Sequence, residues 1–171
     1  MPKFVNLLKQ ADIFYQLTST QLEMIANICE EKSYSPGEVI FPEGAHSDEL
    51  YIIVEGEVDI LVNPSLVSDP KTTRRESTTI TSLRRGQSFG EIALVDQGFR
   101  SATARVGQGN ARLLILPRSK LMELCDCYPQ LGYRLMQNLA ADLALKMRTT
   151  GLLVREELLY GRPGKSDPII T

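Results

Sequence analysis

The middle of the chain, residues 34–117, is divided into short apolar runs by closely spaced turn signals, and this pattern limits the folds that the chain can adopt. The turn signals include "SPG", "PEG", "EG", "RRG" and "GQGN", and the runs between them include "VIF", "LYIIV", "VDILV", "TTIT", "ATARV" and "LLIL". Short runs rich in β-branched and other apolar residues are typical of strands. Many of them at this spacing indicate a sandwich, a jelly roll or a barrel.

One run, "EVDILV" at 57–62, alternates as a strand with one buried face does. Val58, Ile60 and Val62 would lie on one face and Asp59 on the other. The stretch after it, residues 63–77, contains Pro, Ser and Asp residues and interrupts the series of strands. It predicts a long hairpin loop.

Helical patterns flank the β-rich segment on both sides. The first zone covers residues 4–32, and Thr18 or Ser19 offers an N-cap for its main helix. Apolar residues recur there at helical spacing: Leu22, Ile25, Ala26 and Cys29. The second zone begins near Pro117 and is predicted to be helical to about Tyr160.

With 171 residues, the chain is long enough for one domain with a hydrophobic core. We therefore predict a single domain over residues 1–171, of the α+β class and mainly β. Its expected parts are N-terminal helices at 1–33, the β segment at 34–117, C-terminal helices at 118–160 and a flexible tail at 161–171. The Pro and Gly residues of the tail are incompatible with a continued helix.

The second helical zone has two apolar stripes, each on one side of a helix. One stripe contains Met136, Ala140, Leu143, Met147, Val154 and Leu158, and the other contains Leu131, Leu135, Leu139, Leu145 and Leu152. Two apolar faces need two burial partners. The β segment can cover one face. The same helix of a second chain is the simplest cover for the other, which predicts a homodimer; a helix buried on both sides within one monomer is the alternative.

Composition and charge argue against several classes of function. The formal net charge of −2 gives no reason to expect binding to nucleic acid or to a membrane surface. Apolar runs are too short to span a membrane, and the N-terminal residues lack the core of a signal peptide. Three cysteines, an odd number without a secretion signal, are expected to be reduced thiols of a cytoplasmic protein.

A metal centre or a catalytic site is not expected either. Cys125 and Cys127 form a CxC pair without the further ligands of a zinc site. The single histidine, His46, lies in the predicted loop "EGAHSDE", whereas metal centres of the cupin kind need several His or carboxylate ligands on strands. We therefore predict no metal, no catalytic residues and no enzymatic activity.

The stretch "FGEIALVDQGFRSATARV", residues 89–106, places one carboxylate and one guanidinium in an apolar context. Gly90 lets the backbone approach a ligand, and the turn after it presents free N–H groups to an anion. Arg100 offers a planar fork of donors for a phosphate, with the Ser101 hydroxyl beside it. Glu91 would be repelled by a phosphate and suits a ribose hydroxyl. Spacing alone favours a surface ion pair between Glu91 and Arg100 in a strand-to-strand connection, because Glu and Arg often lie this close in a sequence.

This stretch resembles the phosphate-binding cassette of the cyclic nucleotide-binding domain family, which includes catabolite activator proteins and regulatory subunits of cyclic-nucleotide-dependent kinases. The family pattern is roughly F-G-E-[LI]-A-L, a short turn, then P-R-[AS]-A-[TS]. The matching residues are Phe89, Gly90, Glu91, Ile92, Ala93, Leu94, Arg100, Ser101, Ala102 and Thr103. The chain departs from the pattern at Phe99, where the family often has Pro. Flanking stretches, including "LYIIVEGEV", resemble the same family.

The resemblance implies a fold and a ligand. The fold is a jelly-roll β-roll, or double-stranded β-helix, flanked by N-terminal helices and a long C-terminal dimerisation helix. The ligand is a cyclic nucleotide, with cAMP favoured and cGMP possible. Glu91 would accept the ribose 2′-hydroxyl. Arg100 would pair with the cyclic phosphate, assisted by Ser101 and by backbone N–H groups near Ile92 and Ala93. The complete predicted site is Phe89, Gly90, Glu91, Ile92, Ala93, Arg100, Ser101 and Ala102.

The resemblance also implies a mode of action. The base would lie against the C-terminal helix, but the residues at 146–150 match no assignable pattern. The chain lacks the helix-turn-helix segment of the family's transcription regulators after Tyr160, so DNA binding by this chain is not expected. The function indicated is a dimeric sensor that acts through a downstream partner protein. A ligand-free structural or dimerisation module with the same fold is the alternative.

Overall fold

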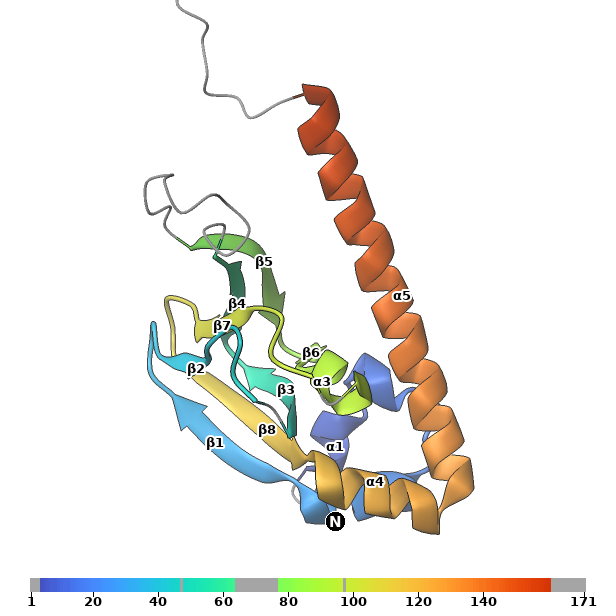
Figure 1. The fold of residues 1–171 in the computed structure, drawn as a ribbon. Coiled ribbons are helices and arrows are strands. Elements are labelled where there is room, and N and C mark those ends of the chain that lie inside the picture. The colour runs from blue at the N-terminus through green and yellow to red at the C-terminus, as the bar shows by residue number, and fades with distance from the viewer. Residues whose placement is uncertain (1–3, 47, 64–76, 97, 161–171) are drawn as a thin grey trace, which may run out of the picture.

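Two four-stranded antiparallel sheets form the centre of the molecule in the computed structural model, which describes residues 4–46, 48–63, 77–96 and 98–160 (Figure 1). One sheet has the order β1-β8-β3-β6 and the other β2-β7-β4-β5. The strands are β1 (Glu30–Tyr34), β2 (Val39–Phe41), β3 (Glu49–Glu55), β4 (Glu57–Val62), β5 (Thr78–Arg84), β6 (Ser88–Phe89), β7 (Thr103–Val106) and β8 (Ala111–Pro117). The predicted mainly β roll of jelly-roll type is confirmed.

Strand β3 contributes to both hydrophobic cores of the molecule, one on each of its faces. Its five central residues, the run "LYIIV", are all buried, because each face of the strand is covered. Tyr51 and Ile53 point into the space between the two sheets, where residues of both sheets pack together. Leu50, Ile52 and Val54 point the other way and pack against the helices. A continuous apolar run is the pattern expected of a strand buried on both faces.

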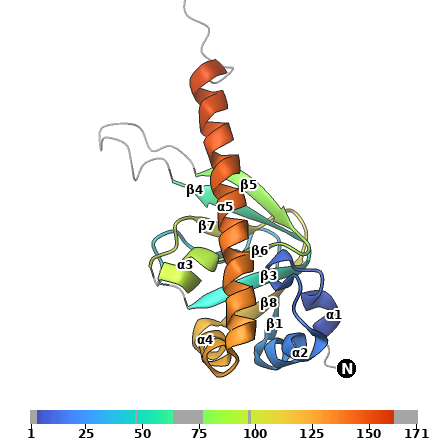
Figure 2. The same cartoon turned by 90° about the vertical axis from the view of Figure 1, so that its right-hand side faces the viewer.

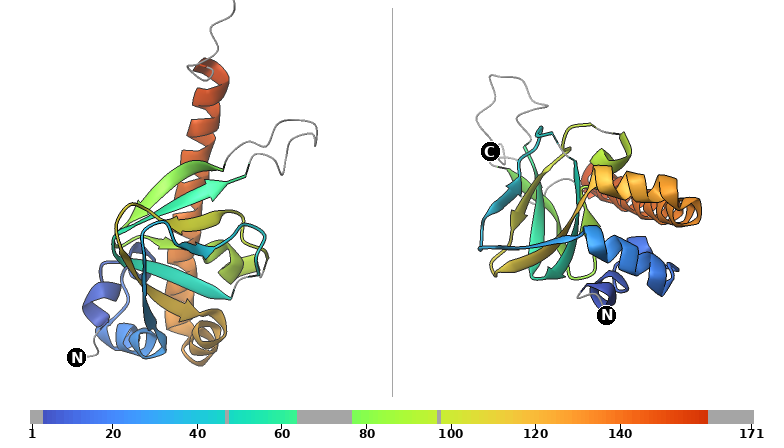
Figure 3. Two further views of the ribbon diagram at one scale, coloured as in Figure 1. Left: turned by 90° about the vertical axis from the view of Figure 1, so that its left-hand side faces the viewer. Right: turned by 90° about the horizontal axis from the view of Figure 1, so that it is seen from below.

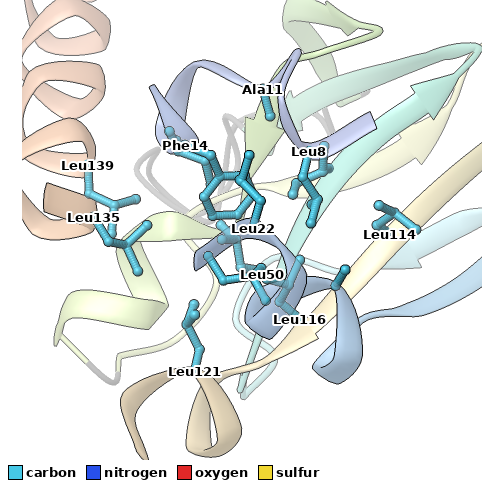
Figure 4. Packing of buried hydrophobic residues seen from close by; sticks show 14 of the residues in the cluster. Leu8, Ala11, Phe14, Leu22, Leu50, Leu114, Leu116, Leu121, Leu135 and Leu139 are labelled. Carbon is cyan, nitrogen blue, oxygen red and sulfur yellow. The ribbon is translucent and has the colours of Figure 1, made fainter. Parts of the chain in front are cut away.

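The helices gather on one outer face of the roll. In the view from below, the N-terminal helices and the C-terminal helices project side by side from this face (Figure 3). They are α1 (Val5–Leu8), the 3-10 helix η1 (Asp12–Phe14), α2 (Ser19–Ile28), α3 (Glu91–Asp96), α4 (Arg118–Cys127) and α5 (Pro129–Tyr160). The core between helices and roll joins residues from both ends of the chain, such as Leu8, Leu22 and Leu135 (Figure 4). This core fixes the first turns of α5 on the roll.

Helix α2 begins as predicted and ends earlier than predicted. Thr18 is its N-cap and forms a capping box with Gln21. The helix ends at Ile28, whereas the sequence pattern predicted helix to residue 32, and β1 follows from Glu30. Residues 30–34 pair along their whole length with β8, so hydrogen bonds to a distant strand override a polar local sequence.

Strand β4 keeps the predicted alternation, and its pairing with β7 runs in unbroken register. The pairing with β5 has an irregularity between Ile60 and Leu61. Val58 and Leu61 are buried, while Ile60 and Val62 are half-buried. The extra residue lies in β5, since Ile60 pairs with Thr81 and Leu61 with Thr79, so the side chains of β4 are not turned over. Val58 and Ile60 both pack in the core between the sheets, as their predicted shared face requires, and Leu61 on the other face is buried as well. The predicted hairpin loop that follows lies mainly outside the described residues, although its flanking strands do pair.

Helix α5 crosses the helical face and then extends beyond the roll (Figures 1 and 2). Of the second predicted stripe, Leu131, Leu135 and Leu139 are buried in the core, whereas Leu145 and Leu152 are exposed. Residues 147–156 are all exposed. In the described part of the chain, no helix combines the length and the apolar character that crossing a membrane requires. The predicted tail at 161–171 lies outside the described residues.

Candidate functional site

Strand β6, Gly90, the short helix α3 and Arg100 follow one another in the chain and form a candidate site beside α5. Phe89 ends β6, Gly90 turns the chain, and Glu91 begins α3. Arg100 lies just before β7 and its backbone is bonded to the 42–45 turn, since its N–H donates to the carbonyl of Ala45 at 2.9 Å. Arg100 and Glu91 are both buried, with 5% of each residue exposed.

Arg100 is a buried cation held by carbonyl groups. Its Nη1 donates to the carbonyl oxygen of Gly90 at 3.3 Å, and its Nη2 donates to that of Glu49 at 3.0 Å. The guanidinium carbon lies 3.9 Å from the ring centroid of Phe41 and 5.4 Å from that of Tyr51. The guanidinium is therefore oriented before any ligand arrives.

This guanidinium also has unused donors. Its Nε is buried without a hydrogen-bond partner among the described residues. Burial lowers the pKa of Arg100. Tyr51, Glu49 and Glu91 oppose this shift, but their effect is smaller than that of burial. A buried charge without an ionic partner is costly, and an anion that reaches Nε would remove part of the cost.

Gly90 is required by the position of Arg100. Its φ of +84° lies in the left-handed region that residues with a side chain rarely adopt. A Cβ at residue 90 would also collide with Nη1 of Arg100 and lie 3.0 Å from the carbonyl oxygen of Glu49. The absent side chain therefore makes the room in which the guanidinium lies.

Glu91 is bound by a residue far along the chain. Its Oε1 accepts a hydrogen bond from Nζ of Lys146 at 3.0 Å, and its Oε2 is buried without a partner in the described structure. The exposed ion pair with Arg100 that spacing allowed is therefore wrong: both side chains are buried, and Glu91 pairs with Lys146. The free Oε2 is a buried acceptor suited to a donor from outside the protein.

Lys146 lies on α5 and connects that helix to the cassette. Besides Glu91, its Nζ contacts Oδ2 of Asp142 at 2.8 Å and donates to the carbonyl oxygen of Ser88 at 3.2 Å. Burial would lower the pKa of Lys146, but the carboxylates of Glu91 and Asp142 outweigh burial and raise it. The ammonium group therefore remains charged at neutral pH.

Comparison with known proteins agrees with this geometry. The profile of the family described as "Cyclic nucleotide-binding domain" matches residues 31–128, more than half of the chain. The chain belongs to the cyclic nucleotide-binding domain family. The relationship inferred from the cassette is thereby confirmed.

Relatives of this cyclic nucleotide-binding domain include whole signalling proteins. A cAMP-dependent protein kinase regulatory subunit of Mycosarcoma maydis is 29% identical over 119 residues, which are 68% of this chain and 21% of the relative. A cGMP-dependent protein kinase of Plasmodium berghei is 32% identical over 98 residues, 57% of this chain and 10% of the relative. The match thus spans only 21% and 10% of the lengths of these two kinase relatives.

Solved structures show the same arrangement. The crystal structure of the Thermus thermophilus catabolite activator protein has a TM-score of 0.69 and 26% sequence identity, covering 85% of this chain and 62% of that one. This cyclic nucleotide-binding domain and the matched part of that protein therefore share one fold.

The other predicted site residues of the cyclic nucleotide-binding domain take supporting positions. The ring of Phe89 is buried and stacks on Tyr51, with centroids 5.0 Å apart. The side chain of Ile92 and that of Ser101 are exposed, and Ala102 is half-buried. The backbone of Ala93 lies in α3. The structure thus brings Phe89, Gly90, Glu91 and Arg100 together and leaves Ser101 at the surface.

Several contributors to the site were not predicted from the sequence. Phe41 and Tyr51 hold the face of the guanidinium, and the hydroxyl of Tyr51 donates to Oε2 of Glu49. Burial raises the pKa of Tyr51, with further contributions from Glu49, so this hydroxyl stays protonated. The contact of Lys146 on α5 with Glu91 was not predicted either. The sequence indicated only that Lys146 could pair with Asp142, which lies four residues before it on the same helix.

Metal binding finds no support in the described residues, where no group of three or more His, Cys, Asp or Glu side chains could hold an ion. Cys125 is half-buried and Cys127 is exposed, both as free thiols. Burial raises the pKa of the Cys29 thiol to about 12.

His46 forms an isolated bridge with Phe99, and their rings are 4.5 Å apart. The histidine therefore packs against a ring of the cassette turn.

Proposed function

We propose that this chain is a regulatory module that binds cAMP through Arg100 and Glu91 and passes the binding event to a partner protein. One observation carries the proposal: a buried guanidinium with a free Nε lies near a buried carboxylate with a free Oε2. These are donors for an anionic phosphate and an acceptor for a hydroxyl, which a cyclic nucleotide provides together. The module acts by binding and not by catalysis.

The choice of cAMP over cGMP rests on relatives. The M. maydis relative is named for cAMP and the P. berghei relative for cGMP, and the latter match covers less of the chain. Calorimetric titration with cAMP, cGMP and 5′-AMP tests the proposal. We expect cAMP to bind most tightly and 5′-AMP, which lacks the cyclic phosphodiester, to bind far more weakly. Absence of binding by both cyclic nucleotides would favour the ligand-free module instead.

Replacement of Glu91 tests the sugar contact. Glu91→Ala should weaken cAMP about tenfold or more, because a hydrogen bond to a charged group is lost. The same variant should weaken 2′-deoxy-cAMP less than about threefold, since that ligand has no hydroxyl to donate. Calorimetry with both ligands gives the comparison, and Glu123→Ala, which removes an exposed carboxylate from α4, is the matched control. Equal losses for the two ligands would contradict the ribose role.

We also propose that the chain forms a homodimer through the C-terminal half of α5. Large apolar side chains recur there at seven-residue spacing and are exposed: Leu145, Leu152 and Leu159. Such spacing keeps a seam on one side of a helix and suits a pair of helices. The exposed Met147 and Val154 belong to the other apolar stripe and lie on the opposite side of the helix from these leucines.

Size-exclusion chromatography with light scattering tests the dimer. The unmodified chain should have twice the monomer mass, and Leu152→Glu should shift it toward the monomer because a charge would be buried in the seam. Thr150→Glu is the control, since residue 150 is exposed and points away from the leucine seam by its position on the helix. A monomeric unmodified chain, or equal effects of both variants, would contradict the proposal.

A further inference from the structure

Lys146 lies at the point where α5 leaves the roll. Before it, α5 is anchored by core leucines and by Asn138, whose Nδ2 donates to the carbonyl oxygens of Ile13 at 3.0 Å and Tyr15 at 2.8 Å. After it, residues 147–156 are exposed, and Met147 is 76% exposed. The contacts of Lys146 with Glu91 and Ser88 are therefore the polar link between the cassette and the projecting half of the helix.

The carboxylate of Glu91 has capacity for two donors at once. Lys146 occupies Oε1, while Oε2 is buried and has no partner in the part of the chain that the structure describes. A carboxylate accepts on both oxygens. A hydroxyl on Oε2 therefore does not need to displace the ammonium from Oε1.

We propose that Lys146 couples the sugar subsite to α5 by sharing the Glu91 carboxylate with the bound ligand, so that ligand binding and docking of the helix strengthen each other. The inference rests on the proposed function. Lys146 acts here as a positioning residue: it orients Glu91 and holds the helix, while the hydroxyl of the ligand contacts Glu91 directly. Because coupling is reciprocal, a loss of helix docking must weaken the ligand as much as the ligand strengthens docking.

The charges around Lys146 support a persistent link. Two carboxylates face its ammonium, that of Asp142 from its own helix and that of Glu91 from α3. The side chain of Glu91 is nearly fully buried, so its charge depends on this partner more than a surface charge would. Asp142 and the carbonyl of Ser88 hold the ammonium in place from two further sides. The link therefore persists with or without ligand, and the ligand adds to it.

The first test compares two ligands in Lys146→Met, which keeps an unbranched side chain of similar length without the charge. We expect the affinity for cAMP to fall about tenfold and that for 2′-deoxy-cAMP to fall less than about threefold, because only the hydroxyl is coupled through Glu91. Arg148→Met removes a positive charge from an exposed position on the same helix and should leave both affinities unchanged. A merely structural role would weaken both ligands equally. Tighter cAMP binding in Lys146→Met would show that the lysine competes with the ligand, which overturns the inference.

The second test does not need the ligand. Hydrogen exchange of the ligand-free chain should show that Lys146→Met and Glu91→Gln each reduce amide protection in residues 143–150. The double variant should show no further loss, since both changes break one link. Additive losses would overturn the link itself. If the link is present and the unmodified chain binds no cyclic nucleotide, the proposed function fails. If the unmodified chain binds cAMP and Lys146→Met binds it equally well, the coupling fails alone.

Discussion

The Arg100→Ala variant is expected to lose at least about 99% of its affinity for cAMP while it keeps its fold. Arg100 is buried, and two of its nitrogens are bonded to the carbonyls of Gly90 and Glu49. Its free Nε and the remaining Nη donors would form charge-assisted hydrogen bonds to two phosphate oxygens. Removing one partner of a buried charge pair costs about 2–5 kcal/mol, much of it from the charge left without a partner.

Isothermal calorimetry measures the affinity, and circular dichroism with thermal unfolding checks that the variant is folded. Arg105→Ala is the matched control, since it removes a half-buried arginine from the adjacent strand β7. Arg100→Lys separates charge from geometry: it keeps the positive charge and loses the fork, so we expect an intermediate loss. Unchanged affinity in a folded Arg100→Ala chain would contradict the proposed phosphate site.

Gly90→Ala is expected to lower both the stability and the affinity, although alanine adds a single methyl group. The new Cβ would meet Nη1 of Arg100 and the carbonyl oxygen of Glu49, and the backbone at residue 90 has a φ of +84°. The backbone strain and the crowding should together lower the free energy of unfolding by about 2–4 kcal/mol. The displaced guanidinium should weaken cAMP by at least about tenfold.

A second glycine separates the two causes. Gly37 has a similar φ of +74°, and a Cβ there would meet nothing within 4 Å. Gly37→Ala should therefore show the backbone strain alone, a loss of about 1–2 kcal/mol, with unchanged affinity for cAMP. Chemical denaturation and calorimetry on both variants give the comparison. If Gly37→Ala and Gly90→Ala behaved alike in both measurements, the steric account of Gly90 would be wrong.

Helix α2 shows which parts of the fold can be predicted from local sequence patterns. The capping signal at Thr18 and the spacing of Leu22 and Ile25 predicted α2 because caps and helix faces depend on residues three or four positions apart. The same reasoning failed at residues 30–32, which were predicted to be helical and lie in β1 (residues 30–34). Their polar sequence shows no strand pattern, and their structure comes from pairing with β8, about eighty residues further along the chain.

The apolar stripes of α5 also combine a feature that the sequence predicted, the helix itself, with one that it did not, the burial of its residues. The spacing of Leu135 and Leu145 predicted that both lie on one helix with apolar sides, and the helix is present. Which part of a stripe is buried depended on where the roll ends. Leu135 lies in the core and Leu145 lies beyond it. A helical period cannot reveal this, since it repeats equally along the whole element.

By itself the sequence supplied the chemical groups of the candidate site: Gly90, Glu91 and Arg100 lie within eleven residues. Their residue types, together with the resemblance to the family's cassette, predicted an anion site beside a hydroxyl acceptor. Only the tertiary structure decided what those groups bind. The carbonyl of Glu49 and the ring of Phe41 orient Arg100, and Lys146 holds Glu91 from a helix 55 residues away. Contacts of this kind arise when the roll closes and α5 packs across it, and no local spacing encodes which distant residue then arrives at a buried carboxylate.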